Sequence, residues 1–293
     1  MGKFSFLKGT QSLHSDRTVH SRLLDSMTYE IIPLKNALSQ ISYLPLGSTI
    51  SVTCSPAKNI EDTLELCENF TEGGHYPIPH LAARMVEDTA HIERIIRRLN
   101  TQGIRKVFII GGDAEQRGPF SDASSFLRVF LDYRPDIDTV GIGGYPDGHP
   151  VISDQLLLES LAEKQEMIFA AGLSGYFATQ MCFDPGTIHD WLTKRRFSGI
   201  TLPCHLGIPG HVDITRLISI SLRLGVGVSA RYLKKNRYSI LRLLNPLRYN
   251  ANRLISPLSG SAEKLGITNV HCFTFNTAEA TEAWRQKSIG RLT

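Results

Sequence analysis

The strongest constraint on the fold is a regular alternation of strand-like and helix-like runs along almost the whole chain. Helical patterns separate short apolar runs, as at residues 87–103, where apolar side chains recur at helical spacing before Gly103. Eight such units in 293 residues fit a closed barrel better than an open doubly wound sheet. Strands are expected at 28–32, 48–54, 75–80, 105–111, 138–144, 175–180, 199–204 and 268–275.

The predicted fold is a single (βα)8 barrel of the TIM type over residues 26–293. Residues 1–25 are predicted to form a polar N-terminal arm that is partly helical. Residues 212–265 contain two or three helical patterns, which places extra helices before the last strand. No internal repeat or low-complexity linker divides the chain, so we expect one domain.

Composition narrows the class of protein. A hydrophobic content of 42% and a charged content of 20% are ordinary for a globular domain. The net charge of +4 suits an anionic ligand, such as a nucleotide or a polyglutamate tail, and no nucleic-acid-binding signature is present. Five widely spaced cysteines without a CxxC pair indicate a reducing, cytoplasmic setting. The sequence contains neither an apolar run long enough to span a membrane nor a signal peptide. Assembly into a homo-oligomer is an open alternative.

Three polar residues follow apolar strands that should end at one face of the barrel. Glu30 lies between apolar neighbours, and partial desolvation favours a neutral carboxyl that can act as a general acid. Asp113 follows two glycines that let a planar ligand approach the backbone. Gln180 offers both a donor and an acceptor to a heterocycle. Each residue could instead have a purely structural role. Glu30 could form a salt bridge at the rim, Asp113 could cap a helix or form an Asx turn, and Gln180 could be a hydrogen-bonded amide in the core.

Other site chemistries find less support in the sequence. His80 and His149 stand at strand ends or in loops, where single histidines are more often structural. No group of histidine, cysteine and acidic residues has metal-ligand spacing, so no metal is expected. The dinucleotide fingerprint GxGxxG, the phosphate-binding Walker motif and the GxSxG nucleophile elbow are also missing.

Eight short segments, in this order, resemble motifs of the methylenetetrahydrofolate reductase family over about residues 28–283. They are YEIIPLK, SVTCS, PHL, GIRKVFIIGGD, YPDGHP, LAEK, TQMCFD and HCFTFN. The resemblance implies catalytic roles for Glu30, Asp113 and Gln180, and substrate contacts from these three and Phe273. It also implies contacts with the cofactor FAD from Thr53, His80, Gly112, Asp113, Ala123, Tyr145, His149 and Lys164.

The resemblance implies reduction of 5,10-methylenetetrahydrofolate to 5-methyltetrahydrofolate by NAD(P)H, through FAD. Gly111 stands where the family has an arginine, and Thr277 replaces a second one, as in a short, divergent branch of the family. We therefore expect FAD to bind weakly. Two alternatives stay open: direct hydride transfer from NAD(P)H without flavin, and a non-catalytic folate-binding subunit of a methyl-transfer system.

Overall fold

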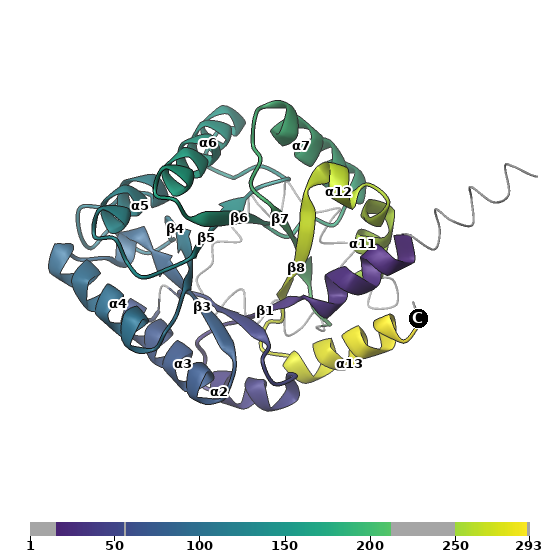
Figure 1. Cartoon of the computed structure of the whole chain (residues 1–293), viewed down its shortest axis with the longest axis horizontal. Helices are drawn as coiled ribbons and strands as arrows, with labels where there is room; N and C mark the ends of the chain where they lie inside the picture. The colour runs from purple at the N-terminus through teal and green to yellow at the C-terminus, as the bar shows by residue number, and fades with distance from the viewer. Residues whose placement is uncertain (1–15, 56, 212–249, 292–293) are drawn as a thin grey trace, which may run out of the picture.

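Eight parallel strands close into a barrel in the computed structural model, which describes residues 16–55, 57–211 and 250–291. The last strand pairs with the first, so the sheet has no free edge (Figure 1). This confirms the predicted (βα)8 fold. The strands are β1 (Thr28–Ile31), β2 (Thr49–Val52), β3 (Tyr76–Ala82), β4 (Lys106–Ile110), β5 (Thr139–Gly144), β6 (Ser174–Thr179), β7 (Cys204–Pro209) and β8 (Ile267–Phe273).

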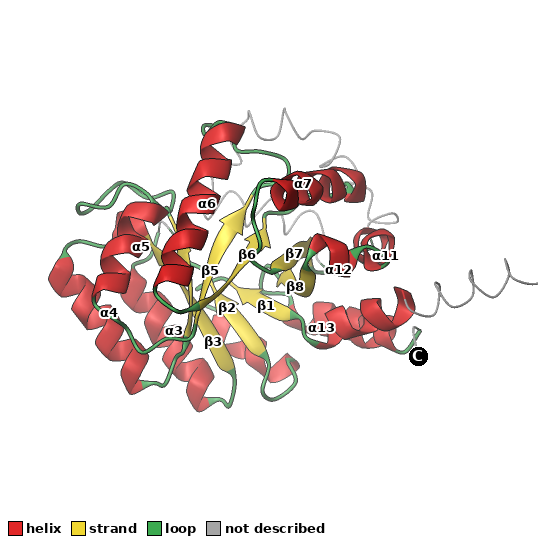
Figure 2. Cartoon of the chain, turned by 45° about the horizontal axis from the view of Figure 1, so that its top comes forward, coloured by secondary structure: helices red, strands yellow, loops and turns green. Residues whose placement is uncertain are grey.

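Helices surround the strands on the outside of the barrel (Figure 2). Several begin at a short polar N-cap whose side chain accepts a hydrogen bond from the first turn, as Asp122 does from the Ser125 amide. Two short helices precede β8, as predicted, and residues 212–249 lie outside the described part of the chain. The α-helices are α2 (Ala37–Gln40), α3 (Ile60–Glu72), α4 (Thr89–Thr101), α5 (Ala123–Asp132), α6 (Asp154–Ala170), α7 (Pro185–Phe197), α11 (Asn252–Ser259), α12 (Ala262–Leu265) and α13 (Ala278–Ile289).

The seventh strand was predicted at 199–204, which is wrong, because β7 begins at Cys204. Buried Ile200 and Leu202 give the preceding connection its strand-like pattern. The backbone of this connection is hydrogen-bonded by side chains and not by a neighbouring strand. Arg196 Nη1 donates to the carbonyls of Ile200 and Leu202, each at 2.8 Å, and Gln165 Oε1 accepts from the Leu202 amide. A buried apolar connection of this kind has the same sequence pattern as a strand.

Residues 16–25, which belong to the predicted polar arm, are helical and pack against the barrel. Leu23 and Leu24 are fully buried in the core. His20 lies against α11, where its Nε2 is 3.1 Å from Asn252 Oδ1. The packing of the barrel therefore begins before the first strand.

A buried ionic cluster fixes α13 to β1. The hydroxyl of Tyr29 donates to Glu282 Oε2. Both carboxylate oxygens of Glu282 accept from Arg285, from Nε at 2.7 Å and from Nη2 at 2.8 Å. Since Glu282 and Arg285 are each less than one-tenth exposed, neither charge has water as a substitute partner.

Replacing Glu282 with alanine should therefore destabilise the barrel by about 3–5 kcal/mol, since it removes both direct hydrogen bonds of the buried Arg285 guanidinium to a carboxylate and leaves only the exposed Asp25, 3.7 Å away. Urea unfolding followed by circular dichroism measures the change in the free energy of unfolding. Glu279→Ala, on the exposed side of the same helix, is the control and should change it by less than about 0.5 kcal/mol. Equal effects of the two substitutions would contradict the role assigned to the cluster.

Candidate functional site

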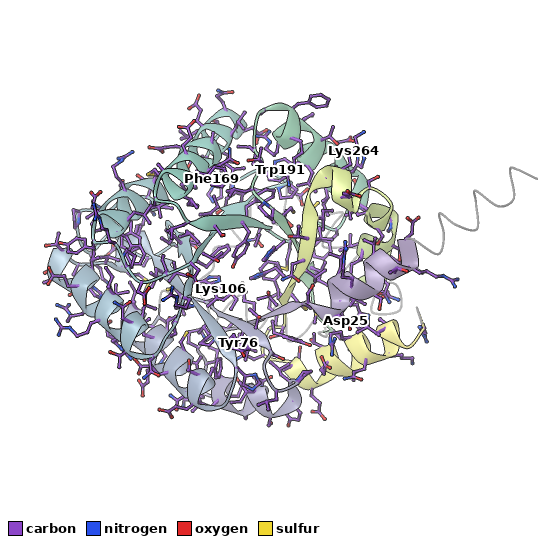
Figure 3. The ribbon with its side chains drawn as sticks, viewed as in Figure 1. Asp25, Tyr76, Lys106, Phe169, Trp191 and Lys264 are labelled. Atoms are coloured by element: carbon purple, nitrogen blue, oxygen red, sulfur yellow. The ribbon has the colours of Figure 1, made fainter. Side chains whose placement is uncertain are left out.

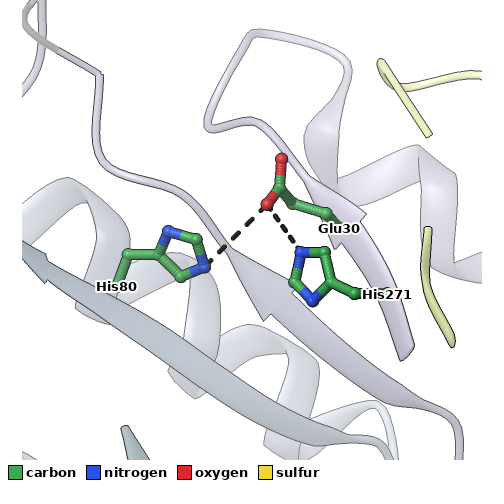
Figure 4. A group of neighbouring side chains, drawn as sticks. All are labelled: Glu30, His80 and His271. Atoms are coloured by element: carbon green, nitrogen blue, oxygen red, sulfur yellow. Dashed lines mark hydrogen bonds and ion pairs between the residues drawn. The ribbon is translucent and has the colours of Figure 1, made fainter. Parts of the chain in front are cut away.

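A carboxylate and two histidines meet inside the barrel (Figure 4). Glu30, on β1, places Oε2 2.8 Å from Nε2 of His271, on β8. His80, on β3, has its Nε2 4.0 Å from the same oxygen and 2.7 Å from Ser51 Oγ. Because side chains alternate along a strand, these residues point inward while neighbours such as Tyr29 point outward. The three strands thus assemble a polar group in the bore.

His80 is held in its neutral form. Burial, and to a smaller extent the nearby His271, lowers the pKa of His80 to about 3. Its ring stacks on Phe108 with centroids 4.5 Å apart. His271, at 2.8 Å, is the direct partner of Glu30, while His80 is 4.0 Å from the same oxygen.

His271 is a candidate functional residue that the sequence analysis did not single out. It lies in the HCFTFN segment, two residues before Phe273, and so on the same face of β8. The ring of Phe273 packs edge-on against it, with centroids 5.1 Å apart. The signal that could have found His271 is the closure of the barrel, which makes β8 the neighbour of β1.

The loop after β8 holds the backbone around Glu30. Thr274 Oγ1 donates to the Glu30 carbonyl at 2.6 Å. The Asn276 side chain bridges the backbone of Ile32, accepting from its N–H at 2.8 Å and donating to its carbonyl at 2.9 Å. Asn276 itself has a φ of 54°, a left-handed conformation that asparagine tolerates better than most residues. The loop after β8 therefore fixes the backbone at the end of β1, while His271 holds the Glu30 side chain.

Asp113 and Gln180 lie at the carboxyl ends of β4 and β6, at the same end of the barrel as Glu30. Both are exposed, whereas the Glu30 side chain is 12% exposed and deeper in the bore. Gln180 Oε1 accepts from the Met181 amide at 2.8 Å. Within the described residues no hydrogen bond joins Glu30, Asp113 and Gln180, so any ligand that touches all three must bridge the bore and its rim.

Asp113 shares its side of the rim with two predicted residues. Tyr145 and His149 pack edge-on with ring centroids 5.4 Å apart. Burial, and then the charge of Asp113, raises the pKa of Tyr145. Gly112 has a φ of 85°, and a β-carbon there would lie 2.9 Å from that of Ala82. The glycine is therefore required by the turn that brings Asp113 to the rim.

The remaining predicted residues are spread around this end of the barrel. Thr53 follows β2, where its carbonyl accepts from Thr63 Oγ1 at 3.1 Å. Ala123 begins α5, next to the backbone of Gly111. Lys164 is buried on α6 and donates to Ser160 Oγ at 3.0 Å.

A cavity of about 320 Å³ opens between the end of β5, α6 and α7. Tyr145 and Lys164 line it, while Glu30, Asp113 and Gln180 do not. Two of the predicted cofactor contacts therefore belong to a space on the outer side of the barrel wall.

The sequence analysis expected no metal, yet the bore contains a group that could hold one. Single ligand atoms of Glu30, His80 and His271 lie within 4.8 Å of one another. The three residues come from distant parts of the sequence, so no ligand spacing signals them. The same atoms are already engaged, with Glu30 Oε2 near His271 and His80 Nε2 near Ser51, so a cation would have to displace these contacts. None of the helices in the described part of the chain is long and apolar enough to cross a membrane.

Comparison with known proteins identifies the family. The family model described as methylenetetrahydrofolate reductase matches residues 29–226, more than half of the chain. The chain belongs to the methylenetetrahydrofolate reductase family. This confirms the resemblance drawn from the motifs.

Curated relatives and solved structures are distant. Methylenetetrahydrofolate reductase 1 of Schizosaccharomyces pombe is 26% identical over 127 residues, which are 41% of this chain and 20% of that protein. Methylenetetrahydrofolate reductase 2 of Saccharomyces cerevisiae is 28% identical over 98 residues, 33% of this chain and 16% of that protein. The matches thus span a fifth or less of these relatives. An uncharacterized Clostridium thermocellum protein, described as binding two copies of 5-methyl-5,6,7,8-tetrahydrofolic acid, has the same fold with a TM-score of 0.64, 15% identity and coverage of 90% of this chain and 95% of its own.

Acid should destabilise the protein through His80. Between its ordinary value of 6.5 and its folded value of about 3, the unfolded chain binds a proton that the folded chain does not. The free energy of unfolding should therefore fall as the pH drops below 6.5, by up to about 1.4 kcal/mol per pH unit. His80→Phe, which keeps a ring against Phe108, should make this slope shallower in urea unfolding from pH 6.5 to about 4. His189→Phe, at an exposed position on α7, should leave the slope unchanged, and equal slopes in all three proteins would contradict the neutral His80.

Proposed function

We propose that this chain reduces 5,10-methylenetetrahydrofolate to 5-methyltetrahydrofolate with NAD(P)H as the hydride donor. The observation that carries the proposal is the inward-facing Glu30 carboxyl, which His271 holds at 2.8 Å near the carboxyl end of the barrel. Membership of the family supports the reaction class. The folate bound by the structurally similar Clostridium thermocellum protein supports the substrate class.

Glu30 is the proposed general acid. The five-membered ring of the substrate must open to a reactive iminium before hydride can reach the methylene carbon, and opening requires a proton on the ring nitrogen. His271 engages Oε2, and no described residue hydrogen-bonds Oε1, so Oε1 is left to face the substrate. His271 fixes the direction of the carboxyl, and the low exposure of the side chain limits competition from water.

Asp113 and Gln180 are proposed to bind and orient the substrate at the rim. The Asp113 carboxylate can accept from the amino-pyrimidine edge of the pterin. The Gln180 amide can donate and accept, which suits the pterin and, in turn, the nicotinamide. Phe273, packed against His271, would contact the substrate next to the acid.

FAD is the proposed cofactor, and when bound it would carry hydride from NAD(P)H to the folate. The cavity beside the bore offers a residue that fits such a group, since Lys164 is a buried cation with only Ser160 as a hydrogen-bond partner among the described residues. Asp113, Tyr145 and His149 would orient the flavin end. The further contacts are proposed for Thr53, His80 and Ala123.

Direct hydride transfer from NAD(P)H is the second candidate, and Gly111 favours it. A charge-assisted hydrogen bond is worth about 1.5–3 kcal/mol, so losing the family's arginine would weaken FAD roughly 10- to 100-fold. The same reduction without a tightly held flavin needs Glu30 and Gln180 in the same roles.

Glu30→Gln should abolish folate reduction while keeping the fold and the folate affinity. The amide is nearly isosteric and can still interact with His271, but it cannot supply the proton, and a general acid is worth about 10²–10⁴-fold in rate. Steady-state kinetics measure the rate, and folate titration measures the affinity. Glu279→Gln, at the exposed position on α13, is the charge-matched control. Reduction by Glu30→Gln within a few-fold of the unaltered protein would refute the assignment, and no reduction by either protein would favour a non-catalytic folate-binding subunit.

Flavin dependence separates the two routes. Protein stripped of flavin should regain NAD(P)H-dependent folate reduction as FAD is added, with half-saturation in the micromolar range expected of weak binding. Full activity of stripped protein without added flavin would establish direct hydride transfer instead.

A further inference from the structure

Glu30, His80 and His271 bring one carboxylate and two imidazoles together inside the barrel (Figure 4). One ligand atom from each residue lies within 4.8 Å of the other two. Among the described residues, this is the only group of three or more histidine, cysteine and acidic side chains that is arranged so closely. The position, on three different strands, makes the group a property of the closed barrel and not of a local motif.

The distances between these atoms are near those that a small divalent ion needs. Two imidazoles and a carboxylate suit zinc and its first-row neighbours. Bonds of about 2.0–2.1 Å in a tetrahedral arrangement place neighbouring ligand atoms about 3.3 Å apart. Glu30 Oε2 lies 2.8 Å from His271 Nε2 and 4.0 Å from His80 Nε2, so the observed distances bracket this value. Small side-chain rotations would bring the three atoms onto one ion.

Aromatic rings fix the position of both histidines. His80 stacks on Phe108 with centroids 4.5 Å apart, and His271 lies 6.1 Å from the same ring. Phe273 packs edge-on against His271 at 5.1 Å. The ligands themselves stand on strands and not on loops, which favours a precise site.

The surroundings of the cluster leave the nitrogen atoms available to a cation. His80 and His271 are 5% and 1% exposed, and side chains of the surrounding strands project into the interior of the barrel (Figure 3). Nδ1 of His271 is buried and has no hydrogen-bond partner among the described residues, so nothing there holds the imidazole in the tautomer that protonates Nε2. The Ser51 hydroxyl, 2.7 Å from His80 Nε2, can rotate away.

We infer that the bore binds one divalent first-row metal ion, with zinc as the best fit, through Glu30, His80 and His271. Three protein ligands leave a fourth position for water or another small donor. A carboxylate that coordinates a metal is deprotonated, so the ion and the acidic proton of Glu30 exclude each other. Metal binding is independent of the proposed function, whereas its expected consequence, inhibition of folate reduction, rests on that function.

Cobalt(II) in place of zinc makes binding visible in the full chain after treatment with a chelator. One equivalent of Co²⁺ should give the visible absorption bands of a four-coordinate site with nitrogen and oxygen ligands. The near-ultraviolet charge-transfer band of a thiolate ligand should be missing, which is informative because the chain has five cysteines. A thiolate band would place the metal on a cysteine and overturn the inference.

Ligand substitutions test the assignment residue by residue. Loss of an outer-shell contact already costs about 10- to 100-fold in metal affinity, so Glu30→Gln, His271→Gln and His80→Phe should each weaken Zn²⁺ more than about 100-fold in isothermal titration. His189→Gln on α7 is the control, since His189 is exposed and its Nδ1 lies 3.3 Å from Asp190 Oδ1. This substitution should leave the affinity unchanged. Circular dichroism melting establishes that each variant is folded, and the cobalt spectrum of the unaltered protein needs no variant.

Folate reduction gives a second readout. Zn²⁺ should inhibit the unaltered protein over the concentration range in which it binds, and a chelator should restore the rate. Mg²⁺ and Ca²⁺, which prefer oxygen ligands, should not inhibit at the same concentrations. In His80→Phe, inhibition relative to that variant's own metal-free rate should require more than about 100-fold more Zn²⁺.

The outcomes separate the metal site from the proposed reaction. Equal Zn²⁺ affinity in the unaltered protein and the three ligand variants would overturn the inference, as would full activity with the site saturated. If the unaltered protein reduces no folate, the proposed function fails, and the cobalt spectrum and the zinc affinities still decide whether the site exists.

Discussion

The pairing of β1 with β8 is the contact on which the candidate site depends. It closes the barrel, and it brings His271 within hydrogen-bonding distance of Glu30. The loop that follows β8 then fixes the backbone of β1 through Thr274 and Asn276. On the outer face of the same strand, Tyr29 binds the buried pair on α13. The four-residue strand β1 is thus held on both faces and at its end. These contacts fix the orientation of the Glu30 carboxyl.

Charge is distributed differently in the bore and in the cavity beside it. In the bore, Glu30 has His271 as its partner, while burial keeps His80 neutral. In the α6–α7 cavity, Lys164 and Arg195 lack acidic partners at bonding distance among the described residues. The first arrangement suits proton transfer in an environment with little water.

The sequence predicted the barrel and most strand positions because apolar runs and helical periods alternate so regularly. It misplaced β7, since Ile200 and Leu202 are buried in a connection whose backbone is satisfied by Arg196 and Gln165. It located Glu30 and Asp113 as strand-end residues, but His271 becomes recognisable only when barrel closure is known. The α7 wall of the cavity was missed for a similar reason, because Trp191 and Arg195 read as ordinary positions on a helix. Tertiary contacts between distant segments decide these features, and a local pattern does not contain them.

The partnership of Glu30 with His271 also has a consequence for the order in which the protein becomes functional. The carboxylate is synthesised 241 residues before its histidine. Domains generally fold as units as they emerge during synthesis, with earlier segments available first. A nascent chain that has built β1 through β7 still has an open sheet and an unpartnered Glu30. The acid acquires its environment only in the final closing step, so the chemistry of the site is switched on by completion of the barrel.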